Sequence, residues 1–158
     1  MTGMSASARL CRPSDEFDPP PVPAAFGIHG EDAGLRERIL VVEDDYFVSL
    51  TIEADLVDAG YEVVAVVATG EAALARADSL RPDLAIVDIR LAGKLDGIET
   101  ATELLRRGIH CIFATAHSDL QTRERARAAC PLGWLTKPFT SGDLLQAVKQ
   151  GLADSGSH

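Results

Sequence analysis

Polar side chains that could carry out chemistry stand directly after several apolar segments of this chain. Glu43 and Asp44 follow ILVV, Asp88 follows LAIV, Thr115 follows CIFA and Lys137 follows WLT. The carboxyl ends of the strands in a parallel α/β sheet share one edge, so we expect these side chains to converge on a single pocket. Three carboxylates, a hydroxyl and an ammonium group in one cleft indicate a site for a divalent metal ion and a phosphoryl group.

The carboxylates of this predicted pocket need a cation. Asp88 could attack a phosphorus atom, but its charge repels the incoming group, and Glu43 and Asp44 add further negative charge. Mg²⁺ suits an oxygen-only site, and we prefer it to Ca²⁺ because the sequence has no calcium-binding loop of the EF-hand type. Lys137 would offer a positive charge to the phosphoryl oxygens and Thr115 a hydroxyl donor. Phosphoryl transfer needs little more than such positioning and electrostatic stabilisation.

The chain from Arg38 onward alternates short β-branched runs with helical patterns, which predicts repeated βα units. The expected strands are 39–43, 62–67, 84–88, 110–114 and 133–136. The expected helices are 46–59, 71–79, 97–107, 118–129 and 140–152, and capping boxes open the last two, Ser118 with Gln121 and Thr140 with Asp143. The predicted fold class is therefore α/β, a doubly wound parallel sheet.

Four motifs follow one another in the order ILVVEDD, AIVDI, FATAHSD and WLTKPF. With them, residues 38–152 resemble the receiver domains of two-component response regulators. The resemblance implies a flavodoxin-like (βα)₅ fold with strand order 2-1-3-4-5, a bound Mg²⁺, and phosphate taken from a histidine kinase. FATAH and the glycine-bearing loop 89–96 also resemble an atypical subgroup linked to unusual histidine kinases of alphaproteobacteria.

The resemblance also implies a role for each residue of the pocket. Asp88 is the expected phosphoacceptor, Thr115 the switch hydroxyl and Lys137 the phosphate-sensing lysine, with a cis bond to the following proline. The expected metal ligands are Glu43, Asp44, Asp88 and the backbone carbonyl of Arg90. We expect no other cofactor. We also expect a phosphoacceptor that assists its own phosphorylation and dephosphorylation, not an enzyme with a separate substrate.

Several positions depart from the family pattern. The loop 89–96 lacks the usual proline and is about one residue longer, with Gly93 and Gly97 supplying its turns. Trp134 stands where receivers usually carry a rotating Tyr or Phe, so it is either a switch residue or a partly buried core tryptophan. His117 and the Arg90 side chain either tune dephosphorylation at the pocket rim or are merely solvated there.

Composition limits the remaining possibilities. The 158 residues are 46% hydrophobic, which suits one domain, and we expect a flexible proline-rich extension over 1–36, a receiver domain over 37–153 and a disordered tail over 154–158. A net charge of −9 disfavours nucleic acid as a partner. The three cysteines form no disulfide or zinc pattern, and the apolar runs are too short to span a membrane, so a cytoplasmic protein is expected.

Four functions remain to be compared. The first is a stand-alone receiver that takes phosphate from a histidine kinase or phosphotransfer protein and signals to a downstream regulator, as a monomer or a phosphorylation-dependent dimer. No DNA-binding output domain is expected after Lys137. The helix with Arg123, Arg125 and Arg127 is either merely a solvated charged face or, as the resemblance implies, part of the family's output surface. The second is a pseudo-receiver that phosphorylation does not switch. A phosphatase is disfavoured because Arg90 replaces its second aspartate, and flavodoxin-like cofactor binding because the first turn is acidic.

Overall fold

The apolar segments of the sequence form the strands of one parallel sheet. The computed structural model describes residues 35–156, and the strands there are β2 (Arg38–Val42), β3 (Glu62–Val67), β4 (Leu84–Val87), β5 (His110–Thr115) and β6 (Gly133–Thr136). Every pairing is parallel and the spatial order is β3-β2-β4-β5-β6. Counted along the chain, this is the order 2-1-3-4-5, so the flavodoxin-like, doubly wound fold is confirmed.

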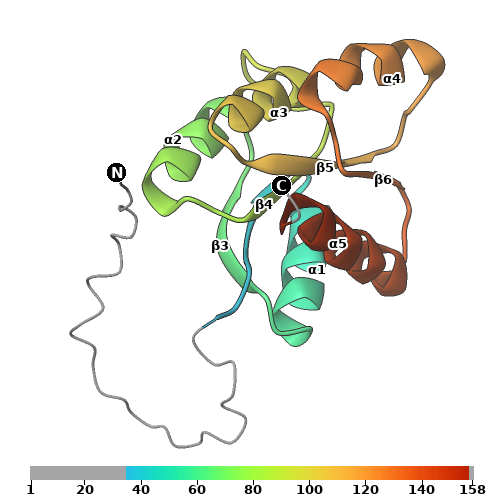
Figure 1. The fold of residues 1–158 in the computed structure, drawn as a ribbon. Helices are drawn as coiled ribbons and strands as arrows, with labels where there is room; N and C mark the ends of the chain where they lie inside the picture. The colour runs from blue at the N-terminus through green and yellow to red at the C-terminus, as the bar shows by residue number, and fades with distance from the viewer. Residues whose placement is uncertain (1–34, 157–158) are drawn as a thin grey trace, which may run out of the picture. The chain divides into compact units, whose positions relative to one another are not determined.

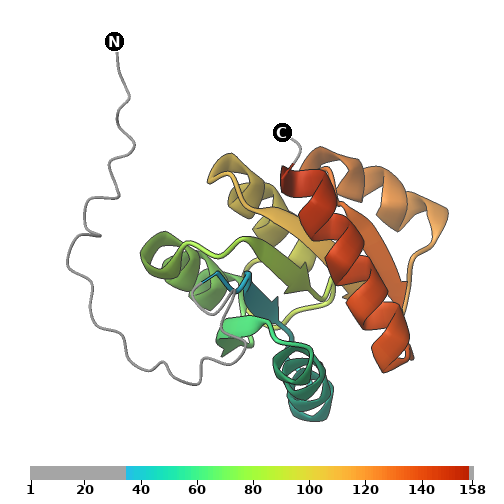
Figure 2. The ribbon, with the colours of Figure 1, turned by 60° about the horizontal axis from the view of Figure 1, so that its bottom comes forward.

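Helices connect the strands and cover both faces of the sheet. They are α1 (Tyr46–Asp58), α2 (Gly70–Leu80), α3 (Gly97–Arg106), α4 (Leu120–Ala126), the short 3₁₀ helix η3 (Arg127–Ala129) and α5 (Ser141–Gly156). Helices α1 and α5 lie on one face and α2, α3 and α4 on the other (Figure 1). A second view shows α1 and α5 on their common face (Figure 2). Because every pairing is parallel, each connecting helix carries the chain back to the amino ends of the strands. All five strands therefore end at the same edge of the sheet.

The central strands are buried on both sides, which explains their continuous apolar sequence. In β2, Leu40 and Val42 pack into the core beneath α2 and α3, whereas Ile39 and Val41 pack into the core beneath α1 and α5. This alternation follows from the two-residue repeat of a strand. The strand ends are consequently fixed by two packed cores, and the residues that follow them are held in place.

The start of α4 differs from the sequence prediction. The expected capping box of Ser118 and Gln121 is wrong, because Asp119 is the N-cap and its Oδ1 accepts a hydrogen bond of 2.8 Å from the amide of Thr122. The carboxylate of Asp119 satisfies one of the free amides of the first turn, so the helix begins one residue later than a Ser118 cap would place it. The Thr140 box of α5 is confirmed, with reciprocal bonds of 3.0 and 3.1 Å to Asp143.

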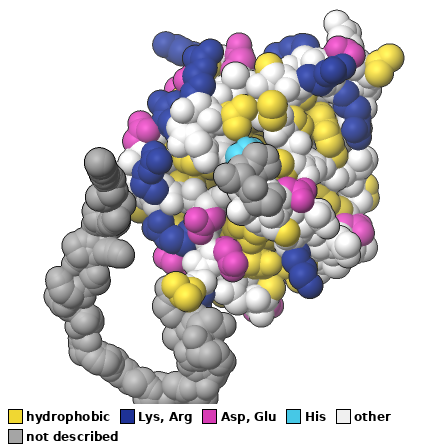
Figure 3. Space-filling view, viewed as in Figure 1, with side chains coloured by type: hydrophobic (Ala, Val, Ile, Leu, Met, Phe, Trp, Pro, Cys, Tyr) yellow, Lys and Arg dark blue, Asp and Glu magenta, His cyan; other side chains and the backbone are white. Residues whose placement is uncertain are grey.

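The C-terminal helix is longer than expected. Helix α5 continues to Gly156, so residues 154–156, assigned to a disordered tail, are helical. Gly151 lets this helix approach β5, since a Cβ there would lie 3.0 Å from Ile112 Cδ1. The predicted extension falls, over residues 1–34, outside the described part of the chain. Among the described helices none is long and apolar enough to cross a membrane. On the face seen in Figure 3, acidic and basic side chains are interspersed.

Candidate functional site

The pairing of β2 with β4 places two carboxylates side by side. Val42 is the register partner of Val87, so Glu43 and Asp88 are the next residues along their strands. Backbone bonds hold both residues: the amide of Asp88 donates to Val42 O at 2.9 Å, and the amide of Glu43 donates to Val67 O at 2.9 Å. The two side chains therefore leave the same edge of the sheet from a rigid backbone.

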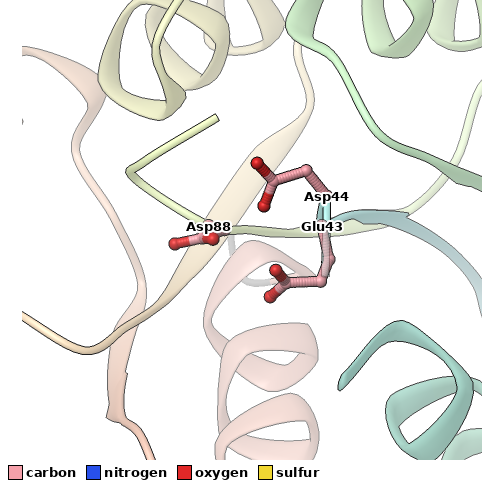
Figure 4. Close-up of side chains that lie close together, drawn as sticks. All are labelled: Glu43, Asp44 and Asp88. Carbon is pink, nitrogen blue, oxygen red and sulfur yellow. The ribbon is translucent and has the colours of Figure 1, made fainter. Parts of the chain in front are cut away.

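Asp44 completes a cluster of three carboxylates at this edge. One oxygen from each of Glu43, Asp44 and Asp88 lies within 4.8 Å of the others, and the three side chains point toward one another (Figure 4). Glu43 and Asp88 are only 3% and 6% exposed, whereas Asp44 is exposed. The donor set is all oxygen and opens to solvent on one side, which fits a hard cation such as Mg²⁺.

Lys137, the residue directly after β6, brings a positive charge into the same pocket. Its Nζ lies 2.7 Å from Glu43 Oε1 and 3.3 Å from Asp88 Oδ2. The following bond to Pro138 is cis, as expected, and the amide of Lys137 donates to Thr115 O at 2.9 Å. The ends of β2, β4 and β6 thereby bring Lys137 against the carboxylates of Glu43 and Asp88.

The pKa values of Glu43 and Lys137 are shifted by burial and by neighbouring charges. Burial raises the pKa of Glu43, and the nearby Asp88 charge adds to that, against the lowering effect of the Lys137 hydrogen bond. For Lys137, burial lowers the pKa, but the hydrogen bond to Glu43 and the charges of Asp88 and Glu43 outweigh it, so its pKa is raised. Lys137 is therefore cationic, and its charge offsets part of the negative charge of the carboxylates.

Thr115 ends β5 at the same edge of the sheet and is almost completely buried. Its hydroxyl donates to His117 O at 3.1 Å and accepts from the His117 amide at 3.2 Å. The hydroxyl is thus bonded to its own loop and not to the carboxylates of the pocket. A group arriving at Asp88 would have to compete with these local bonds to recruit it.

The loop 89–96 is anchored at its base beside Asp88. The amide of Arg90 donates to Asp88 Oδ1 at 3.2 Å, and the amide of Gly97 donates to Ile89 O at 2.8 Å. A Cβ at Gly97 would overlap the carbonyl oxygen of Asp88, so this position needs glycine for close approach. Gly93 has a positive φ of 99°, which confirms its predicted turn.

The far end of the same loop is held by contacts that the sequence analysis did not predict. Thr69 forms an isolated parallel bridge with Ala92, and Glu71 Oε2 accepts a hydrogen bond of 3.0 Å from the Lys94 amide. Asp96 caps α3 and its other oxygen lies 2.8 Å from Arg125 of α4. Only the capping box of Asp96 with Glu99 has a sequence signal, because the other contacts join separate elements.

Trp134 is half-buried on β6 and contacts Phe113 of β5, with ring centroids 5.1 Å apart at 44°. The guanidinium carbon of Arg123 lies 4.3 Å from the centroid of the indole. The sequence predicted that α4 carries exposed arginines, but it did not predict which of them would meet Trp134. That choice depends on how α4 packs over β6.

An α/β sheet with an acidic pocket at its carboxyl edge defines a flavodoxin-like domain with a candidate metal site. The family model of the response regulator receiver domain matches residues 39–149, and the chain belongs to that family. Receiver domains are phosphoacceptors of two-component systems rather than conventional enzymes, and they bind Mg²⁺ at an acidic cluster. The resemblance to receiver domains that the four motifs indicate is therefore confirmed.

Individual relatives agree with this membership. The chain is 34% identical over 119 residues to the transcriptional regulatory protein PdtaR of Mycobacterium tuberculosis, covering 75% of this chain and 58% of PdtaR. It is 29% identical to sporulation initiation phosphotransferase F of Bacillus subtilis, covering 75% of this chain and 95% of that protein. Because the chain spans little more than half of PdtaR, the family membership concerns the receiver domain alone.

Solved structures show the same architecture. The signal receiver domain of a modulated diguanylate cyclase from Desulfovibrio desulfuricans matches with a TM-score of 0.73 and 36% identity, over 77% of this chain and 98% of that chain. A CheY-like receiver domain protein from Methanospirillum hungatei matches with a TM-score of 0.71 and 29% identity, over 78% of this chain and 98% of that chain.

Proposed function

We propose that this chain accepts a phosphoryl group on Asp88 from a histidine kinase or a phosphotransfer protein and signals through a surface that changes on phosphorylation. The observation that carries the proposal is the position of the Asp88 carboxylate. It is nearly buried, faces two further carboxylates and lies 3.3 Å from the ammonium group of Lys137. These groups form an acceptor oxygen with neutralising charge beside it.

The proposed transfer needs few groups from the protein. An Asp88 oxygen forms a bond to phosphorus as the bond from phosphorus to the donor histidine nitrogen breaks, so the phosphoryl group moves with no net redox change. We propose that Glu43, Asp44, Asp88 and the carbonyl of Arg90 hold Mg²⁺. When bound, the ion supplies positive charge that offsets the charge on the phosphoryl oxygens.

Lys137 supplies the charge that the protein itself contributes to the transferred group. Its Nζ is shared between Glu43 and Asp88, so it needs only to shift from carboxylate to phosphoryl oxygens. Thr115 would give up its bonds to His117 and donate to the phosphoryl group, which moves the loop before α4. The same machinery would assist later loss of the phosphoryl group to water.

The signal would pass to a downstream regulator protein by contact. The proposed relay uses a kinase that draws on ATP, and we therefore expect the protein in the cytoplasm with its donor. We propose no nucleic acid or membrane partner. A monomer, or a dimer formed after phosphorylation, would suit this mode of signalling.

Intact-protein mass spectrometry tests the proposal. The wild type is incubated with acetyl phosphate and Mg²⁺, or with acetyl phosphate and EDTA, beside Asp88→Asn and the matched surface control Asp58→Asn. We expect one phosphoryl adduct in the wild type and in Asp58→Asn, little with EDTA and none in Asp88→Asn. A folded wild type without an adduct would favour the pseudo-receiver, an interaction module that phosphorylation does not switch.

A further inference from the structure

Arg123 lies over Trp134 in an arrangement that the neighbouring arginines of α4 and η3 do not share. Its guanidinium carbon is 4.3 Å from the centroid of the indole ring, within the range of a cation–π contact. Arg125 pairs with Asp96 at 2.8 Å and Arg127 with Glu124 at 3.4 Å. Two of the three arginines are thus held by carboxylates, whereas Arg123 contacts the aromatic ring.

Arg123 also contacts the loop that follows Thr115. Its Nε donates to the carbonyl oxygen of Ser118 at 3.3 Å. One residue earlier, both backbone groups of His117 are bonded to the hydroxyl of Thr115, at 3.1 and 3.2 Å. A continuous set of contacts therefore leads from the Thr115 hydroxyl through the loop to Arg123 and the indole of Trp134.

The indole is anchored on one side by the core. It packs against Phe113, which is fully buried and is its register partner on the neighbouring strand. Arg123, by contrast, is exposed and long, so it can change rotamer without disturbing the core. Of the two, the guanidinium is the part that can move when the loop moves.

A groove opens beside this contact. It has a volume of about 270 Å³, and its lining consists of Leu120, Arg123, Glu124, Arg127, Pro131 and Trp134. Leu120 is 79% exposed at the start of α4, next to the loop. Displacement of Arg123 would add the covered face of the indole to this partly apolar groove.

We infer that Arg123 is a movable cover on Trp134, and that phosphorylation of Asp88 withdraws it. When Thr115 leaves His117 to bind the phosphoryl group, the loop carrying Ser118 shifts and Arg123 loses its hold over the indole. The signal then reaches the α4–β6 surface by uncovering the tryptophan and not by rotating it. The inference rests on the proposed function for its trigger, whereas the cover itself exists without phosphate.

Quenching of tryptophan emission by acrylamide tests the cover first. The chain has one tryptophan, so the emission reports this contact alone. Without any phosphate analogue we expect Arg123→Ala and Arg123→Gln to raise the quenching constant by about twofold, because the charged cover is lost. The matched control Arg127→Ala, from the adjoining 3₁₀ helix η3 and the same groove, should equal the wild type. Equal quenching in the wild type and both Arg123 variants would overturn the inference.

Beryllium trifluoride with Mg²⁺ tests the trigger, with binding followed by ¹⁹F NMR and Asp88→Asn as the control. We expect the analogue to raise quenching in the wild type and in Arg127→Ala, and to change nothing further in Arg123→Ala. Unchanged quenching in the wild type with the analogue bound would overturn the withdrawal alone. If the analogue does not bind in an Asp88-dependent way, the proposed function fails and the withdrawal fails with it, while the quenching without analogue still reports the cover.

Discussion

Lys137 Nζ lies 2.7 Å from Glu43 Oε1, although the two residues are 94 positions apart in the chain. The glutamate side chain is 1% exposed and the lysine side chain 20% exposed. The protein's own ammonium group therefore offsets part of the negative charge of the acidic pocket. Any cation that enters must share Glu43 and Asp88 with this lysine.

Removal of the lysine charge should destabilise the ligand-free protein. Lys137→Met leaves two buried carboxylates without their cation. We expect the free energy of unfolding, measured with urea in the presence of EDTA, to fall by about 1–3 kcal/mol. This loss is smaller than for a fully buried ion pair because the lysine is partly solvated. Mg²⁺ should restore more stability to the variant than to the wild type. The exposed Lys149→Met is the control. Equal unfolding curves for all three proteins in EDTA would contradict this role of Lys137.

The contact between Lys137 and Glu43 also predicts how stability depends on pH in the alkaline range. The pKa of Lys137 in the folded state is raised above its ordinary value of 10.5. The stabilising contribution is therefore complete below 10.5 and is lost as the pH rises through the folded-state pKa. We expect the free energy of unfolding of the wild type, measured in EDTA, to fall toward that of Lys137→Met above this pH. A difference between the two proteins that stays constant across the alkaline range would contradict the assignment.

Gly97 should tolerate no side chain. An added methyl group would overlap the carbonyl oxygen of Asp88, so we expect Gly97→Ala to lower stability by about 1–3 kcal/mol and to slow phosphorylation as the Asp88 backbone shifts. Gly142→Ala in α5 is the matched control, because its nearest neighbour, Thr140 Oγ1, is 3.7 Å away. Chemical denaturation and adduct formation measure the two effects. A Gly97→Ala protein as stable as Gly142→Ala would show that the helix does not press on Asp88.

The two described cysteines should differ in reactivity. Burial raises the pKa of the Cys111 thiol, which lies in the core, whereas Cys130 is exposed. In a Cys11→Ser background we expect iodoacetamide to modify Cys130 in the native protein and Cys111 only after unfolding. Peptide mass spectrometry identifies the modified residue. Early modification of Cys111 in the native state would show that the core around β5 opens.

The sequence predicted the sheet well, because each strand is an apolar run placed between turn signals. The strands at 62–67 and 133–136 have the predicted bounds, and Gly60 and Gly108 adopt the positive φ expected after helix ends. The N-cap of α4 was misplaced because Ser118 and Asp119 are both good caps in adjacent positions. Local propensity cannot decide between them when the path of the loop depends on Thr115 and His117.

The carboxylate cluster was also predictable, since residues at the ends of parallel strands must meet. The contacts of Lys137 with Glu43 and of Arg123 with Trp134 have no local signal. They depend on how a loop and a helix pack over strands that are distant in the chain. Sequence reasoning therefore located the pocket but not the side-chain pairs of Lys137 with Glu43 and of Arg123 with Trp134.

The most direct test of the central claim is to identify the phosphorylated side chain chemically. After incubation with acetyl phosphate and Mg²⁺, borohydride reduces an aspartyl phosphate to homoserine, which peptide mass spectrometry can assign to a single position. We predict homoserine at residue 88 in the wild type and none in a sample without acetyl phosphate. Homoserine at another aspartate, or at none in a folded protein, would contradict the assignment of Asp88 as the phosphoacceptor.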